Sequence, residues 1–84
     1  MPDNRLYWYF TAQMAEDVGQ DDMAEKYLAK AFWMNPNDGM TYNDYVALLT
    51  RRGKTTEASR AAMKWLTYYP GDQRARQLVN IRKQ

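Results

Sequence analysis

Adjacent carboxylates stand at two places in the sequence, Glu16-Asp17 and Asp21-Asp22. Paired carboxylates can hold a divalent cation or share a proton between a general acid and a general base. The segment around them lacks the ligand number and the spacing of a calcium-binding loop. A helix end followed by helix caps explains these side chains better, because short acidic residues accept hydrogen bonds from the free N–H groups at a helix start.

Nucleophilic chemistry also has little support in the sequence. Ser59 is the only serine, and because the chain has no histidine this serine has no imidazole base. The absence of cysteine and histidine also removes thiolate nucleophiles, disulfide bonds and zinc sites built on these residues. No glycine-rich phosphate-binding loop is present. We therefore expect a protein that is not an enzyme and that has no metal and no cofactor.

A short proline-containing motif recurs along the chain at a constant interval of 34 residues. Its three copies are Pro2-Asp3-Asn4, Pro36-Asn37-Asp38 and Pro70-Gly71-Asp72. In each copy, a residue suited to capping a helix follows the proline by two positions. A period between about 20 and 50 residues is typical of stacked supersecondary units. The sequence therefore predicts a repeat protein in which each unit contacts its neighbours.

The segments between these motifs have the apolar periodicity of helices and no alternation typical of strands. We expect five helices, with starts at Asn4, at Asp21 or Asp22, at Asp38, at Thr55 or Thr56, and at Asp72. Asp22 and Glu25 also have the spacing of a capping box. Gly19 and Gly53 suit the left-handed residue that closes a helix. The predicted fold class is all-α.

The two predicted hairpins match residue by residue at the same separation. Small residues, Ala24 and Ala58, are aligned where the helices of each hairpin must approach closely. Two other aligned pairs exchange a large residue and a small one: Leu28 with Ala62, and Ala31 with Trp65. Such an exchange conserves core volume, so we expect the ring of Trp65 to be buried.

These features resemble the tetratricopeptide repeat, a helix-turn-helix unit of the same length. Residues 24–31, followed by Asn-Pro-Asn-Asp at 35–38, are similar to the second helix and exit turn of that family, and residues 53–58 are similar to its turn between helices. The sequence departs from the family pattern at several positions: Thr11, Ala12, Asp21, Val46, Thr55 and Trp65. The resemblance implies a right-handed superhelix of antiparallel hairpins. Residues 1–84 would form a single domain, with repeats over 5–38 and 39–72 and a capping helix over 73–84.

The resemblance also implies a protein or peptide partner, bound on the concave face that the first helix of each hairpin lines. The implied binding residues are Leu6, Tyr9, Gln13, Met40, Asn43, Ala47, Arg51, Arg74 and Gln77, with Glu16, Asp17, Thr50 and Ile81 on the same surface. The alternative is that a two-repeat arc is too shallow to bind a partner, and that Tyr9 and Met40 only cover the core. A subgroup of the family clamps the C-terminal carboxylate of chaperones. At the corresponding positions here only Arg74 has the required charge, and Asp44 would repel a carboxylate.

An aromatic run at residues 6–10 places bulky apolar groups on every side of the first predicted helix. A helix that is apolar all round is expected to be buried all round. Two explanations remain open: further repeats upstream, or a subunit contact in a homo-oligomer formed by Tyr7, Tyr9 and Phe10. Left exposed, such a face exceeds the apolar patch usual for a monomer.

The distribution of charge bears on the partner. The net charge is +2, but the acidic residues gather in the first half and the basic residues in the second. This asymmetry fits head-to-tail contacts or an acidic partner near the C-terminal end, and the alternative is that these charges only form solvated outer faces. A net charge this small argues against nucleic acid, and no apolar run is long enough to insert into a membrane. The sequence leaves the compartment open, with a slight preference for a soluble cytoplasmic protein over a periplasmic one that is part of a longer chain.

The sequence therefore predicts a non-catalytic protein–protein interaction module, an adaptor or scaffold, that holds a peptide or a helix on its concave face or on its aromatic first helix. The alternative is a self-assembling or secretion-type chaperone that uses the aromatic helix as a subunit contact.

Overall fold

The structure is a computed structural model that describes residues 4–83, with side chains described for residues 6–80. The predicted Pro2-Asp3 turn and the side chain of Ile81 lie outside these limits. Within residues 4–83 the regular structure is entirely helical, as predicted, in five helices. They are α1 (Asn4–Asp17), α2 (Asp21–Met34), α3 (Gly39–Arg51), α4 (Thr55–Leu66) and α5 (Gln73–Lys83).

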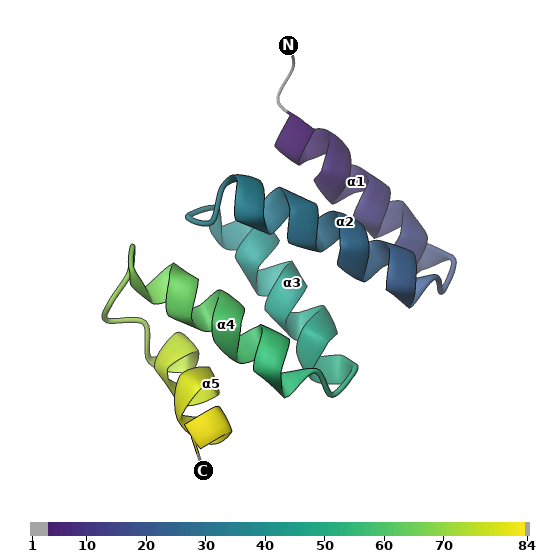
Figure 1. Ribbon diagram of the computed structural model, residues 1–84. Helices are drawn as coiled ribbons and strands as arrows, with labels where there is room; N and C mark the ends of the chain where they lie inside the picture. The colour runs from purple at the N-terminus through teal and green to yellow at the C-terminus, as the bar shows by residue number, and fades with distance from the viewer. Residues whose placement is uncertain (1–3, 84) are drawn as a thin grey trace.

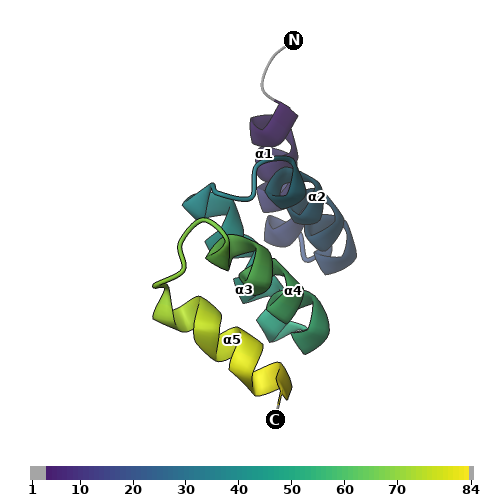
Figure 2. The same cartoon turned by 60° about the vertical axis from the view of Figure 1, so that its left-hand side comes forward.

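Each helix packs against the next one along the chain, from α1 to α5. Figures 1 and 2 show the resulting order in space, with α1 at one end of the molecule and α5 at the other. The described part of the chain measures 36 × 28 × 14 Å, so it is about two helices thick at most in its shortest direction. Residues far apart in sequence therefore share a surface only where one hairpin meets the next.

The turns that close α1 and α3 have the same hydrogen bonds at positions 34 residues apart. In the first turn the N–H of Gly19 donates to the carbonyl of Glu16 at 3.0 Å, and the N–H of Gln20 donates to the carbonyl of Ala15 at 2.8 Å. The turn at Gly53 repeats both bonds at 3.0 and 2.8 Å. This pattern requires a left-handed residue, and the two glycines have φ of 78° and 74°. The predicted role of both glycines is confirmed.

The predicted caps of α2 and α4 are wrong. Their N-cap residues are Gln20 and Lys54, and neither side chain makes a capping hydrogen bond. Gln20 and Lys54, the residues after the two glycines, already close the preceding helix through their N–H groups. Their carbonyls then accept the first hydrogen bond of the next helix, from the N–H of Ala24 and of Ala58, at 3.0 Å in both cases. The turn is therefore too short for Asp22 or Thr55 to stand at the cap position.

The caps of α3 and α5 agree with the prediction. The carboxylate of Asp38 accepts a hydrogen bond from the N–H of Met40 at 3.2 Å, and the carboxylate of Asp72 accepts one from the N–H of Ala75 at 3.2 Å. The indole N–H of Trp65 also donates to Asp72, at 2.7 Å. This bond connects the end of α4 to the start of α5, and so fixes the angle at which α5 covers the second hairpin.

The core follows the helix interfaces and is rich in aromatic rings. Trp65 is buried, as predicted, and its indole stacks on the ring of Tyr42 with centroids 4.4 Å apart. In the first hairpin Trp8, the residue aligned with Tyr42, stacks on Tyr27 with centroids 5.4 Å apart. Ala24 and Ala58 are both buried at their helix crossings. Among the described helices none is both long and apolar enough to cross a membrane.

Candidate functional site

An open groove runs between α3 and the start of α5, and its volume of about 820 Å³ is in the range of ligand-binding sites. Six residues that the sequence assigned to a concave binding face line it: Asn43, Ala47, Thr50, Arg51, Arg74 and Gln77. Its other lining residues are Tyr42, Val46, Asp72 and Leu78. We call this feature the α3–α5 groove.

The floor of the α3–α5 groove is apolar and continuous with the core. Val46 and Leu78 are half-buried there, and both pack against the buried cluster. Burial, and then the charge of Asp72, raises the pKa of Tyr42 to about 12. Because the phenol stays protonated at neutral pH, the floor carries no charge of its own and suits an apolar side chain of a ligand.

Uncharged polar groups stand on both walls of the groove. Asn43 on α3 and Gln77 on α5 are exposed, and each side-chain amide has both a donor and an acceptor. A peptide backbone has the same two kinds of group, so an amide can satisfy it without regard to the peptide's sequence. The walls are therefore suited to an extended peptide rather than to a small apolar molecule.

The charged side chains that line the groove are the guanidinium groups of Arg51 and Arg74 and the carboxylate of Asp72. Arg51 is held in place by acidic residues of the first hairpin, with its Nη2 atom 3.1 Å from Asp21 Oδ1 and 3.6 Å from Glu16 Oε2. Arg74 is exposed at the other wall, close enough to Asp72 to help lower the pKa of that carboxyl. The larger effects on Asp72 are the hydrogen bonds from Trp65 and from the N–H of Ala75. Arg74 is thus the cation best placed to meet an acidic ligand.

The structure places Tyr9 and Gln13 elsewhere. The Tyr9 hydroxyl donates to Asp44 Oδ2 at 2.6 Å, and Gln13 Nε2 donates to the same oxygen at 2.8 Å. Tyr9 is only 9% exposed and belongs to the core. The expectation that Tyr9 forms a subunit contact or a groove wall is therefore corrected: its ring is covered and its hydroxyl already has a partner.

The remaining predicted residues lie outside the α3–α5 groove. Leu6 and Met40 are exposed but are not among its lining residues. Glu16 acts indirectly, since it holds Arg51, and Asp17 lines a separate hollow at the end of the first hairpin. Tyr7 and Phe10 are exposed, and the subunit contact predicted for them stays a prediction.

Sequence reasoning missed the role of Asp44, which it considered only as a charge that would repel a carboxylate. Asp44 instead joins α1 to α3 by accepting two hydrogen bonds. Aligning the repeats could not reveal this contact, because the residue aligned with Asp44 is Phe10, which is exposed. The sequence did contain a signal for this contact: an acidic residue on one helix, Asp44, and two hydrogen-bond donors one turn apart on another, Tyr9 and Gln13.

No model of a known protein family matches the sequence, and no curated protein is significantly similar to it. The geometry of the groove and the internal repeat are therefore the features that bear on function.

Proposed function

We propose that this protein is a non-catalytic interaction module of the tetratricopeptide-repeat type, in which the α3–α5 groove binds an extended segment of a partner protein. The support is that six residues assigned to a binding face by the family resemblance line one groove. An adaptor or scaffold role is supported by the mixture of apolar, amide and guanidinium side chains in the lining, which is suited to holding a peptide. The repeated turns at Gly19 and Gly53 support a superhelical arrangement of the two hairpins.

The chemistry of the groove indicates the class of peptide. An apolar side chain of the peptide would occupy the floor over Val46 and Leu78, and an acidic residue would pair with Arg74. The amides of Asn43 and Gln77 would hydrogen-bond to the peptide backbone. A single carboxylate without an apolar neighbour has less to gain, because most of the affinity of such sites comes from buried side chains in the centre of the contact.

The experiment is selection of binding sequences from a display library of random linear peptides, followed by measurement of dissociation constants by fluorescence polarisation. We expect sequences that combine an apolar residue with an acidic one. Arg74→Glu should weaken their binding by roughly tenfold or more, the effect of reversing one charge pair at a contact centre. Ala47→Trp should also weaken binding, because Ala47 is exposed in the groove and a larger side chain would fill the space.

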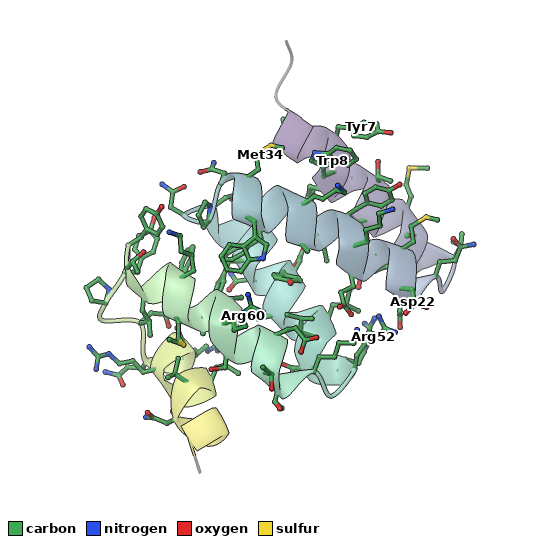
Figure 3. All side chains as sticks on the ribbon, viewed as in Figure 1. Tyr7, Trp8, Asp22, Met34, Arg52 and Arg60 are labelled. Carbon is green, nitrogen blue, oxygen red and sulfur yellow. The ribbon has the colours of Figure 1, made fainter. Side chains whose placement is uncertain are left out.

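The matched control is Arg60→Glu. Arg60 is an exposed residue of α4 that lies with Trp33, Tyr45 and Glu57, none of which lines the groove, and Figure 3 marks its position on that helix. Its substitution changes the net charge as much as Arg74→Glu does but leaves the groove intact. The proposal fails if no peptides are selected, or if both groove variants bind the selected peptides as tightly as the Arg60→Glu control.

A further inference from the structure

Exposed apolar side chains form a stripe along one face of α1. Tyr7, Met14 and Val18 are 61%, 69% and 70% exposed, and Thr11 lies half-buried between them. These residues are separated by four, three and four positions, so they share one face of α1, with Val18 in the turn directly after its last residue, where its N–H still donates to the carbonyl of Met14. Figure 3 shows the ring of Tyr7 projecting from α1 away from the other helices. We call these residues the α1 stripe.

The internal repeat shows what normally covers such a stripe. The residues 34 positions after Tyr7, Thr11 and Met14 belong to α3, and they are buried: Thr41 at 0%, Tyr45 at 5% and Leu48 at 1% exposure. Both α2 and α4 pack against α3, and the ring of Phe32 on α2 contacts Tyr45. The uncovered α1 stripe therefore occupies the place where the second hairpin has a packed helix.

Two contacts show how α2 covers α3. The ring of Phe32 on α2 lies 5.6 Å from the ring of Tyr45, between centroids. Arg52, at the end of α3, pairs with Glu25 at 2.8 Å and with Asp22, both of α2 (Figure 3). The residue aligned with Arg52 in the first hairpin is Val18. The α1 stripe thus has an apolar residue where α3 has a charge that selects an acidic helix, so its partner must differ from α2.

The α1 stripe continues into a hollow of about 520 Å³ at the end of the first hairpin. Its lining residues are Thr11, Met14, Ala15, Asp17, Val18, Gln20 and Met23. Methionine adapts its shape to irregular partners, so a surface with two methionines can accept a neighbouring side chain without a fitted pocket. This hollow extends the apolar face from α1 onto the start of α2.

We infer that the α1 stripe is a contact between two copies of this chain, with the two α1 helices antiparallel. The spacing of the stripe makes it complementary to itself in that orientation. Tyr7 of one copy meets Val18 of the other, and Met14 meets Thr11, so each large side chain faces a smaller one. In a parallel pair Tyr7 would face Tyr7 and Met14 would face Met14. These pairs of large side chains would hold the helices apart and leave gaps between the smaller side chains, which close packing excludes.

Charge favours the same orientation. α1 has no basic residue in its last turn, and Asp17 is exposed there, near the negative end of the helix dipole. An antiparallel second copy places the positive N-terminal end of its α1 beside Asp17. A parallel copy would bring the two Asp17 carboxylates together at the same end. The antiparallel pair therefore relieves an unfavourable charge, and the parallel pair adds to it.

The area available is sufficient for a modest dimer. Aromatic side chains contribute about 150–250 Å² each when fully buried, so five partly exposed apolar side chains offer roughly 500 Å² per copy. The five are Tyr7, Phe10, Met14, Val18 and Met23. Both copies together then bury about 1,000 Å², near the lower limit of specific interfaces. We expect a dissociation constant in roughly the micromolar range, because interfaces of this size are rarely tighter without a central hot spot.

The test is the mass of the purified protein as a function of concentration, measured by sedimentation equilibrium. We expect a change from the monomer mass of 10.0 kDa to twice that value. Met14→Lys should raise the dissociation constant by roughly 30-fold, as expected for a charge placed in the centre of an apolar contact. Met63→Lys is the matched control, since Met63 is an exposed methionine of α4, distant from the stripe in sequence and fold. Equal effects of the two variants, or a monomer at every concentration, would overturn the inference.

Disulfide trapping separates the orientations, and the chain has no cysteine of its own to interfere. Tyr7→Cys and Val18→Cys are prepared separately and then mixed under mild oxidation. An antiparallel dimer gives the mixed product, with Cys at 7 linked to Cys at 18, in excess over either symmetric product. Symmetric products in excess would show a parallel pair, and head-to-tail association would appear as masses beyond the dimer; either result contradicts the proposal. Peptide binding in the α3–α5 groove should be the same for Met14→Lys and wild type, so failure here leaves the proposed function standing.

Discussion

The hydroxyl of Tyr9 donates a 2.6 Å hydrogen bond to Oδ2 of Asp44, and this bond joins two helices, α1 and α3, that are not neighbours along the chain. Gln13 donates to the same oxygen at 2.8 Å. Asp44 thus accepts two hydrogen bonds in a partly buried site, both from α1. These bonds fix the position of α1 relative to α3, because hydrogen bonds to a charged acceptor are short and directional. The first hairpin is therefore oriented on the second by more than apolar packing.

We predict that Tyr9→Phe lowers the free energy of unfolding by about 1–2 kcal/mol. The substitution keeps the buried ring but removes a hydrogen bond to a charged group, which leaves Asp44 with one donor fewer. Urea denaturation monitored by circular dichroism measures the change. Tyr68→Phe is the control, because Tyr68 is exposed and its loss of a hydroxyl should alter stability by less than about 0.5 kcal/mol. Equal stabilities for the two variants would show that the Tyr9–Asp44 bond contributes nothing.

The same residue predicts a loss of stability at alkaline pH. Burial, and then the hydrogen bond to Asp44, raises the pKa of Tyr9 to about 12. In the unfolded chain a tyrosine loses its proton at about pH 10, so between pH 10 and 12 the folded state binds more protons than the unfolded state. The contribution of protonated Tyr9 to the free energy of unfolding is therefore fully present below pH 10. It falls as pH rises, by up to about 1.4 kcal/mol per pH unit.

Urea denaturation of wild type and Tyr9→Phe at several pH values between about 8 and 11.5 measures this effect. The slope of stability against pH should be smaller for the variant. Some slope should remain, because burial also raises the pKa of Tyr42 to about 12. Identical slopes for the two proteins would contradict the assignment to Tyr9.

A third prediction concerns the turn that closes α3. Gly53 has φ of 74°, and a Cβ added there would meet no atom within 4 Å. The cost of Gly53→Ala is therefore conformational only, about 1–2 kcal/mol for a left-handed alanine. Gly71→Ala is the matched control, since its surroundings are also open and its φ is not positive. That variant should be neutral or more stable by up to about 1 kcal/mol. Thermal and urea denaturation of both variants would refute the prediction if Gly53→Ala were no less stable than Gly71→Ala.

The glycines show why the architecture could be predicted from the sequence. A left-handed turn requires glycine for a local steric reason, and a cap such as Asp38 acts on the N–H groups of the residues that follow it. Both signals depend on a few neighbouring residues and recur at an interval of 34 residues. The number of helices and their approximate ends follow directly. The cap positions of α2 and α4 were wrong because one residue, Gln20 or Lys54, performs two roles in each short turn.

The surface was harder to predict because it depends on contacts between distant residues. Residues 6–10 are uniformly bulky, so composition alone could not tell which of them is covered. Tyr9 is buried because Asp44, 35 positions away, accepts its hydrogen bond, whereas Tyr7 has no helix packed across its face. Six residues that the resemblance assigned to one face of α3 and α5 do line the α3–α5 groove, and the binding of a partner there stays a prediction.

The cap of α5 predicts a loss of stability in acid. The hydrogen bond from the Trp65 indole, followed by that from the N–H of Ala75, lowers the pKa of Asp72. An aspartate in an unfolded chain has a pKa of about 3.9, so the stabilisation is fully present above that value and is lost as pH falls through the lower pKa of the folded state. Asp72→Ala should cost about 1–2 kcal/mol at pH 7, because it removes the cap and leaves the indole N–H without its acceptor.

Asp72→Asn provides the comparison, because asparagine can still cap the helix but does not titrate. Denaturation at pH 7 and at about pH 3 should show a smaller decrease in stability for this variant than for wild type. An equal decrease would mean that other carboxylates account for the acid sensitivity and that the Trp65–Asp72 bond does not.

Two buried hydroxyls in the second hairpin should respond oppositely to removal. Ser59 on α4 is buried, and its Oγ has no hydrogen-bond partner in the part of the chain that the structure describes. Thr41 on α3 is also buried, but its Oγ1 donates to Asp38 at 3.0 Å. A buried hydroxyl without a partner loses its hydration and gains nothing in return, so Ser59→Ala should raise stability by about 0.5–1.5 kcal/mol. Alanine is also the better helix former.

Thr41→Val should lower stability by about 1–2 kcal/mol, because valine keeps the shape but leaves Asp38 without that donor. Both variants are measured by urea denaturation at pH 7. The sign of each change carries the argument, since both substitutions remove one hydroxyl from the same hairpin core. If Ser59→Ala proved as destabilising as Thr41→Val, the Ser59 hydroxyl would have to be satisfied in solution, most simply by a buried water between α4 and its neighbours.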